Sequence, residues 1–395
     1  MFSMLRLLLA AALALPVYGQ TVGDPLSPWA EGSLDIHFIN TGRGDAALLV
    51  LPDGTSLQID AGDGGWGAPP RGVSPKPNGS RPAGEWLARY ARRVLAGDSQ
   101  PMIDYAMLTH LHGDHMSGFE ALAKNIPVGT MLDRAYPDYD YPVKQPEGEA
   151  TDYISFVKNG VRAGRMKAER LQPGRNDQIR LLRRPEAYPN FEVRNIAANG
   201  EVWTGVGTAT RKHFPAELSA LPEGEMPSEN QSSAAIRVSY GPFDFYSGGD
   251  MPGVIQPGLP SWMDVETPVA KAVGPVEIAA ANHHGNRDST NAFFAATLRP
   301  RFWILQVWSS DHPGHDVLDR MLSKRLYSGE RNVVGTNMPR ANYDVIGPLL
   351  EELLSDQGHI VFRVAPGGGS YRLMILEDSD ESMRVKSVHG PFEAR

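Results

Sequence analysis

The chain has 395 residues, of which 41% are hydrophobic and 21% are charged, and its formal net charge is −8 at pH 7. This composition is typical of a folded protein that can bury a large core. The acidic balance argues against a general nucleic-acid binder, which usually carries a basic excess. Because the sequence has no cysteine, disulfides and thiolate ligands are excluded, and any metal site must use His, Asp, Glu or Asn.

The N-terminus has the layout of a secretory signal. Arg6 precedes an apolar run over residues 7–15, which ends in small residues at Gly19. This run is shorter than the ~20 residues that a membrane-spanning helix needs, which favours a cleaved signal over an N-terminal anchor. We therefore predict a signal peptide over 1–19, a tether over 20–33, and export to the periplasm or the extracellular space, without a transmembrane segment in the mature chain.

The first half of the remaining chain begins with strands and continues with alternating strands and helices. Strands are predicted over 34–39, 46–51, 56–59 and 102–108, and helices over 85–95 and 116–124. Asp53-Gly54 is a strong hairpin signal between the second strand and the third.

The second half repeats this order. A hairpin is predicted over 234–246, buried strands over 276–280 and 302–307, helices over 290–297, 317–326 and 343–354, and final strands over 360–364 and 371–376. Two such halves predict an α/β fold in which two sheets pack face to face with helices outside. We expect one four-layer αββα sandwich domain over residues 34–395.

The strongest chemical signal is MLTHLHGDHMSG over residues 107–118. It places four candidate ligands on a turn between an apolar strand and a helix: His110, His112, Asp114 and His115. The first two are two residues apart and can point the same way from an extended chain, whereas the last two begin the helix and can face a second position. Such a loop can supply imidazole and carboxylate ligands to two adjacent divalent cations, with zinc favoured and manganese or iron as alternatives.

HLHGDH resembles the H-x-H-x-D-H signature of the metallo-β-lactamase fold superfamily, and further segments agree with that resemblance in order. They are Asp60 in LQIDAG, Asp250 in FDFYSGGDM, HHG at 283–285, and SDHPGHDVLDRM with His312. FINTGRGDAALLVLPDG, NQSSAAIRV and NHHGNRDST are similar to the ComEC/Rec2-type hydrolase branch, whose soluble relatives include phosphorylcholine esterases. The resemblance covers residues 34–376.

The resemblance implies roles for these residues. Asp60 would hold the metal loop from beneath, and Asp250 would bridge both metals. His284 is the expected ligand of the second metal and His283 a contact to substrate, with the reverse assignment left open. His312 would stabilise an oxyanion or protonate a leaving group, unless it only caps the next helix.

The sequence departs from the superfamily pattern at one place. Many members have a further His between the HLHGDH loop and the bridging Asp, and here that region reads RNIAANGEVW, with Asn199 near the expected position. His213 is the only His between His115 and Asp250. Asn199, His213 or water is left to complete the first metal site.

The predicted mechanism is hydrolysis by hydroxide at a dinuclear centre, because metal-bound water has a pKa near ~7. Asp114 would be both ligand and acceptor for the attacking group, with His283 and His312 as the other candidate catalytic residues. The branch resemblance favours a phosphodiesterase or nuclease acting on a small or polymeric phosphoester, with nucleic acid as substrate only. The alternatives are a lactonase or β-lactamase and a non-catalytic binding module, and the oligomeric state stays open.

Two further features bear on the substrate. The segment 158–184 carries nine Lys and Arg residues against two acidic residues, which is typical of a solvated face or of an attractor for an anion. Aromatic residues in loops could reach the mouth of the site and hold a cationic head group or stack a base, although ordinary loop packing is the alternative. They are Trp66, Trp86, Tyr136, Tyr139 and Tyr141.

Overall fold

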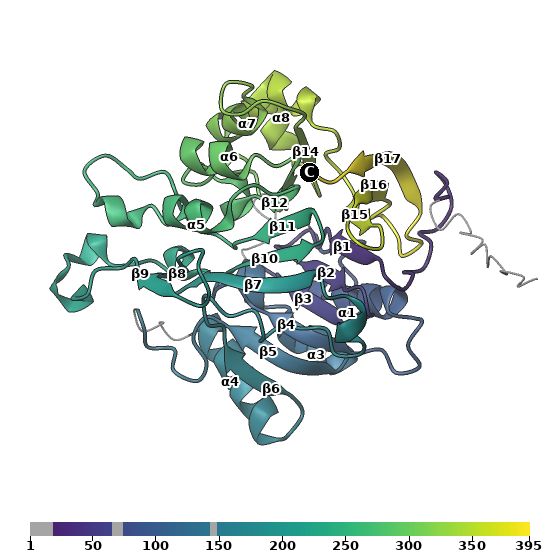
Figure 1. Ribbon diagram of the computed structural model, residues 1–395, viewed down its shortest axis with the longest axis horizontal. Helices are drawn as coiled ribbons and strands as arrows, with labels where there is room; N and C mark the ends of the chain where they lie inside the picture. The colour runs from purple at the N-terminus through teal and green to yellow at the C-terminus, as the bar shows by residue number, and fades with distance from the viewer. Residues whose placement is uncertain (1–18, 65–73, 143–147) are drawn as a thin grey trace, which may run out of the picture.

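Two large sheets form the centre of the molecule (Figure 1). The structure is a computed structural model, and it describes residues 19–64, 74–142 and 148–395. The predicted signal peptide therefore lies outside the described residues, apart from Gly19. Among the described residues no helix has the length and apolar character needed to cross a membrane.

The first sheet has nine strands within the described ranges. Their order is β17 (Val385–Glu393), β16 (Ser370–Leu376), β15 (His359–Val364), β1 (Leu34–Phe38), β2 (Ala47–Val50), β3 (Ser56–Ile59), β4 (Ile103–Met107), β5 (Val128–Asp133) and β6 (Lys167–Arg170). Strands β3 to β6 are parallel to one another, and the other neighbours are antiparallel.

The second sheet has eight strands in the described part of the chain. Their order is β14 (Asn332–Gly335), β13 (Phe302–Leu305), β12 (Ile278–Ala280), β11 (Phe243–Ser247), β10 (Ala235–Tyr240), β7 (Phe191–Ala198), β8 (Glu201–Trp203) and β9 (Thr210–Lys212). Here β11 to β14 are parallel.

Helices cover the outer face of each sheet. Figure 1 shows α3 and α4 on one side of the sheets and α6, α7 and α8 on the opposite side. The first sheet carries α1 (Ala83–Val94), α3 (Phe119–Asn125) and α4 (Glu149–Arg162), and the second carries α5 (Glu266–Val273), α6 (Ala292–Leu298), α7 (His315–Leu322) and α8 (Arg340–Ile346). The predicted αββα sandwich is confirmed.

Alternation along the strands produces these layers. Ile36 and Phe38 of β1 and Leu49 of β2 belong to the core between the two sheets. Leu48 and Val50 of β2 belong to the core under α1 and α3. Because successive side chains of a strand point to opposite faces, a strand that is covered on both faces is apolar at almost every position.

The parallel strands determine where functional side chains collect. Ile59 of β3 pairs with Met107 of β4, and both strands end at the same edge of the first sheet. In the second sheet β11 and β12 are also parallel and end together. Ligand sites of α/β sheets lie outside such carboxyl ends. The segments after β4, β11 and β12 carry the candidate metal ligands, and the segment after β3 carries Asp60.

The segment predicted as a tether lies against the C-terminal region. The Gly23 amide donates to the Val385 carbonyl oxygen, and the Leu26 amide donates to that of Met383, each at 2.9 Å.

Candidate metal centre

The HLHGDH loop follows β4 and enters the short helix α2 (Gly113–Met116). His112 is extended, with φ −101° and ψ 150°, whereas Asp114 and His115 lie inside the helical turn. This change of backbone conformation divides the four side chains into two pairs that face different positions. All but His112 are buried.

Two groups of His and carboxylate donors are found in the described ranges. In each group the candidate ligand atoms all lie within 4.8 Å of one another. One group consists of His110, His112 and Asp250, and the other of Asp114, His115, Asp250 and His284. The three-donor group and the four-donor group therefore share the Asp250 carboxylate.

The distances inside the groups suit cation binding. Two atoms that each lie ~2.1 Å from one zinc ion are separated by at most roughly 4 Å. His110 Nε2 is 3.1 Å from His112 Nδ1 and 3.8 Å from Asp250 Oδ2. His115 Nε2 is 3.1 Å from Asp250 Oδ1, and His284 Nε2 is 3.4 Å from Asp250 Oδ2. Asp250 therefore presents one oxygen toward His115 and the other toward His110 and His284.

The HHG turn follows β12 with an unusual backbone. His283 and His284 have φ values of 48° and 54°, which are uncommon for residues with a side chain. Glu266 helps to hold this loop, since its carboxylate accepts hydrogen bonds from the Asn282 side chain at 2.8 Å and from the Thr290 amide at 2.6 Å. The turn directs His284 into the four-donor group, whereas His283 belongs to neither group.

Each of three imidazoles has a carboxylate on its Nδ1 atom. His115 Nδ1 lies 2.8 Å from Asp60, His284 Nδ1 lies 2.8 Å from Asp45, and His283 Nδ1 lies 2.6 Å from Asp288. A carboxylate in this position fixes the tautomer and leaves Nε2 as the ligand atom. The structure thus places Asp60 against a candidate ligand, as expected from the sequence.

The electrostatics of the cluster depend on these carboxylates. Burial opposes the charged form of His115, but Asp250, Asp114 and Asp60 outweigh it and hold the pKa of His115 well above its usual value. Burial also acts against ionised Asp250, yet the nearby His115 and His284 hold its pKa well below the usual range. The donors therefore form a buried network of opposite charges that favours the ionised carboxylates.

The described residues fit divalent cations. His115 Nε2 and Asp250 Oδ1 are buried and make no hydrogen bond. Buried polar atoms usually make a hydrogen bond, and two that lie 3.1 Å apart without one, inside a set of imidazoles and carboxylates, fit the ligands of a cation. The donor set of nitrogen and oxygen atoms suits zinc, manganese or iron.

Neither residue proposed to complete the first metal site joins its donors. Both polar atoms of the Asn199 side chain are engaged by Arg134, through its guanidinium at 2.9 Å and its carbonyl oxygen at 2.8 Å. His213 follows β9, where its amide donates to the Gly200 carbonyl oxygen at 2.7 Å, and it belongs to neither donor group. The group formed by His110, His112 and Asp250 thus has three donors against four in the other.

His312 lies beside His284, with 4.7 Å between the ring centroids. Its Nε2 atom accepts the backbone amides of Trp308 and Ser309, each at 3.1 Å, and its Nδ1 atom is 3.2 Å from Asp311. Both nitrogens are therefore engaged within the 308–312 loop. This geometry gives His312 a contact with the preceding loop and not the predicted helix cap, because α7 begins after Gly314 without a side-chain cap.

A cavity of about 550 Å³ opens over the donors. It is lined by His112, Asp114, Asn230, Asp250, His283, His284, Asn286 and residues 308–312. Tyr136 and Tyr141 line a different cavity together with Asn199 and Arg170. Tyr139 is buried and donates to Asp133 at 2.6 Å, so it has a packing role.

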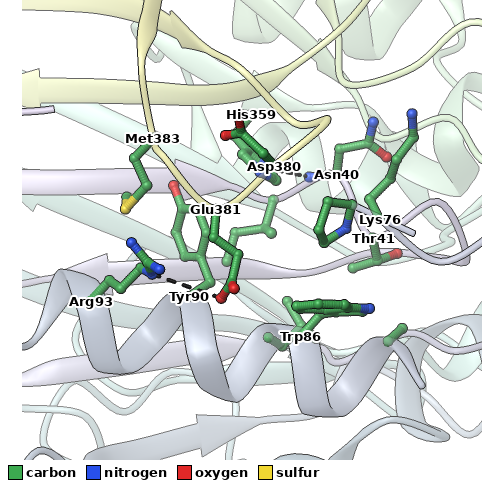
Figure 2. A pocket seen from close by; sticks show the side chains of 14 residues that line it. Asn40, Thr41, Lys76, Trp86, Tyr90, Arg93, His359, Asp380, Glu381 and Met383 are labelled. Atoms are coloured by element: carbon green, nitrogen blue, oxygen red, sulfur yellow. Dashed lines mark hydrogen bonds and ion pairs between the residues drawn. The ribbon is translucent and has the colours of Figure 1, made fainter. Parts of the chain in front are cut away.

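Trp86 also lies away from the metal donors. In Figure 2 it projects from α1 with Tyr90 and Arg93 toward the loop that carries Asp380 and Glu381. These side chains line a separate cavity between α1 and that loop. Its volume is about 30 Å³, which is enough for about one water molecule. The idea that Trp86 reaches the mouth of the metal site is therefore wrong, and Trp66 lies outside the described residues.

Comparison with known proteins supports the assignment of this centre. Residues 80–156, which include the whole HLHGDH loop, match the family model described as the metallo-beta-lactamase superfamily. The matched segment covers 77 of the 395 residues and is similar to that superfamily. A search of curated proteins finds no match.

Several solved structures are similar to this chain. CmlA, a diiron beta-hydroxylase from Streptomyces venezuelae, is 13% identical over 86% of this chain and 55% of its own, with a TM-score of 0.40. A metallo-beta-lactamase from Cronobacter sakazakii is 12% identical over 65% and 78%, with a TM-score of 0.30. A diphosphatase from the PhnP family is 10% identical over 84% and 98%, with a TM-score of 0.33. The chain thus spans about half the length of CmlA.

One important contact of the HLHGDH loop was not predicted from the sequence. Glu229 accepts the backbone amide of Leu111 at 2.7 Å, between the first two metal-loop histidines. Arg134 donates to both oxygens of Glu229 at 2.6 Å, and its side chain is fully buried. This buried ion pair fixes the backbone of the loop. No local pattern predicts it, because the two residues are 95 positions apart.

Replacing Asp60 by Asn should weaken metal binding. Asp60 accepts hydrogen bonds from the Thr109 amide at 2.7 Å, the Thr109 hydroxyl at 2.8 Å and His115 Nδ1. An amide group in its place turns one acceptor into a donor, so we expect roughly 10- to 100-fold lower zinc affinity by calorimetric titration. Asp53→Asn is the matched control. Asp53 also accepts backbone amides, but in a turn remote from the donors, and equal affinity losses in both variants would contradict the prediction.

Proposed function

We propose that this chain is an exported metallo-hydrolase that cleaves phosphoesters or phosphodiesters at a dinuclear metal centre. The observation that carries the proposal is the position of Asp250, whose carboxylate belongs to both donor groups. A shared carboxylate places two cations close together, as hydrolytic two-metal sites require. The intact donor set speaks against a non-catalytic binding module.

Two divalent cations would activate water for attack and offset the negative charge of the transition state. The described residues would provide the geometry for this chemistry. His284 and His115 are oriented by Asp45 and Asp60, so their Nε2 atoms face the shared carboxylate. Asp114 Oδ2 lies 3.0 Å from His284 Nε2 in the same cluster, where it can act as ligand and hydrogen-bond acceptor.

His283 is the residue best placed to transfer a proton. Its Nδ1 atom is held by Asp288, while its Nε2 atom lies 3.7 Å from Asp250 and 3.3 Å from the Asn230 amide nitrogen. Although burial disfavours its charged form, Asp250 and Asp288 raise the pKa of His283. An imidazole held by Asp288 at the cavity wall can pass a proton to a leaving-group oxygen. His312 would support the reaction by holding the adjacent loop.

The choice of phosphoesters rests on the branch resemblance and on charge. A phosphoryl group is anionic and suits two cations. The basic segment 158–184 is partly neutralised, since Arg175 pairs with Asp177 and Arg183 pairs with Asp104. A lactonase or β-lactamase activity remains the second candidate, because the net charge of −8 favours no particular anionic substrate.

Metal analysis combined with a substrate screen tests the proposal. The protein should contain zinc, manganese or iron, and should hydrolyse bis(p-nitrophenyl) phosphate, p-nitrophenylphosphorylcholine or DNA. His112→Ala and Asp114→Ala should abolish this activity while leaving the circular dichroism spectrum nearly unchanged, and a chelator should do the same reversibly. Hydrolysis of nitrocefin or of an acyl-lactone alone would establish the second candidate. Full activity in either variant would refute the assignment.

A further inference from the structure

Trp308 places an indole N–H at the wall of the metal cavity. It follows β13 in the 308–312 loop and lines the cavity together with Asp250 and His284. Its Nε1 atom is 3.4 Å from His284 Nε2, and the two rings are perpendicular, at 89° with centroids 6.1 Å apart. The donor group of Trp308 thus points at an atom of the four-donor group.

The indole is positioned by its own loop. His312 Nε2 accepts the Trp308 backbone amide, and the two rings contact at 5.5 Å in an edge-on arrangement. His312 is buried, and its other nitrogen lies beside Asp311. The loop is therefore preorganised, and Trp308 needs no large movement to keep its N–H directed into the cavity.

The contact between Trp308 and His284 cannot persist when a cation is bound. His284 Nδ1 lies beside Asp45, and Nε2 lies 3.0 Å from Asp114 and 3.4 Å from Asp250, as well as 3.4 Å from the indole nitrogen. A cation at Nε2 occupies the single lone pair of that nitrogen, so the indole N–H, which can only donate, has no acceptor there. Leaving a directed donor without a partner costs free energy, and an oxygen atom of a bound anion would supply the partner.

We propose that Trp308 Nε1 donates a hydrogen bond to an oxygen of the anion bound at the metal centre, and that the 308–312 loop thereby forms an anion subsite. This inference rests on the proposed function and adds a substrate-contacting residue to it. The ligands that fit are tetrahedral oxyanions such as a phosphate ester or inorganic phosphate. Some of their oxygens can bind the cations while another accepts the hydrogen bond of the indole N–H.

The other residues of the cavity wall agree with such a ligand. Asn230, Asn286, Ser309 and Ser310 are neutral and polar, while Asp311 contributes a carboxylate at the same wall. A hydrogen bond with His312 lowers the pKa of Asp311 and keeps it charged. In the absence of cations this charge would repel an anion, so binding should depend on metal.

Phosphate binding to the zinc-loaded full chain tests the proposal. Trp308→Phe keeps an aromatic ring but removes the N–H, and it should bind inorganic phosphate about 5- to 10-fold more weakly by calorimetry, the loss typical of one neutral hydrogen bond. Zinc content should be unchanged, and zinc affinity should be equal or higher, because the N–H no longer competes for His284. The metal-free protein should show no phosphate binding.

Trp203→Phe is the matched control. Its indole N–H donates to the Gly207 carbonyl oxygen in the turn between β8 and β9, and it does not line the cavity. Phosphate affinity in this variant should equal that of the wild type. Unchanged phosphate affinity in zinc-loaded Trp308→Phe would overturn the proposal, as would loss of zinc from this variant, which would indicate a structural role.

Activity measured on the same preparations separates the two proposals. Wild-type protein that hydrolyses bis(p-nitrophenyl) phosphate, together with a Trp308→Phe variant of unchanged phosphate affinity, would refute only the role of Trp308. Zinc-loaded wild type that binds phosphate through Trp308 but cleaves no phosphoester would refute only the proposed function. If Trp308 contacts the substrate, Trp308→Phe should raise KM or lower kcat for phosphoesters without shifting the melting temperature.

Discussion

Asp250→Asn should lose both metals and nearly all hydrolytic activity. The carboxylate belongs to the three-donor and the four-donor group, and its two oxygens face His115 on one side and His110 and His284 on the other. An Asn side chain keeps the shape but offers one weaker oxygen and no charge. Loss of a hydrogen bond to a metal ligand lowers metal affinity ~10- to 100-fold. We expect a larger fall here, because Asp250 is itself a ligand.

The measurement for Asp250→Asn is metal content after dialysis against a buffer with a defined zinc concentration, followed by assay of phosphodiester hydrolysis. Asp244→Asn is a matched control on β11, the strand that precedes Asp250, because Asp244 pairs with Arg237 and belongs to neither donor group. That variant should keep two metals and full activity. Two tightly bound zinc ions in Asp250→Asn would show that the cations do not share this carboxylate.

Gly62→Ala should displace the metal loop. A Cβ atom at Gly62 would lie 1.9 Å from the carbonyl oxygen of Asp114 and 2.7 Å from the Asp45 amide. The contact is to backbone on both sides, so no flexible side chain can give way. Gly62 also donates to the Asp45 carbonyl oxygen, and Asp45 donates to that of Asp114, at 2.8 and 2.9 Å. The backbones of three segments, around positions 45, 62 and 114, are therefore in direct contact.

We expect Gly62→Ala to lower the free energy of unfolding by ~1–3 kcal/mol or more, as overpacking does, and to lose metal at the four-donor group because Asp114 is displaced. Chemical denaturation and metal analysis measure the two effects. Gly97→Ala is the control, since a Cβ atom there meets nothing within 4 Å. Wild-type stability and metal content in Gly62→Ala would show that the loop can shift without harm.

The parts of the fold that the sequence predicts well are those with local signals. The strand expected over 56–59 matches β3, and the hairpin over 234–246 matches β10 and β11 within one residue at its ends. The helix α4 was not predicted, although Ala150, Tyr153 and Val157 have helical spacing and are buried. Strand β17 was also missed. It contains Gly390-Pro391, a dipeptide that argues against a strand. β17 lies at the edge of the sheet, where a proline is tolerated.

The metal site also combines residues with local sequence signals and contacts that have none. Spacing alone indicated the HLHGDH ligands, and the structure brings Asp250 and His284 to them from the second sheet. The supporting contacts could not be predicted, because they join distant positions. His284 and Asp45 are 239 residues apart, and Glu229 and Leu111 are 118 apart. Such pairs are defined only by the packing of the two sheets.

The shared carboxylate has a consequence for how the molecule holds together. His110 to His115 follow a strand of the first sheet, whereas Asp250 and His284 follow strands of the second. Cations bound there would be reversible cross-links between the two halves of a chain that has no cysteine. Neither half contains a complete ligand set, so tight metal uptake and docking of the sheets would have to occur together.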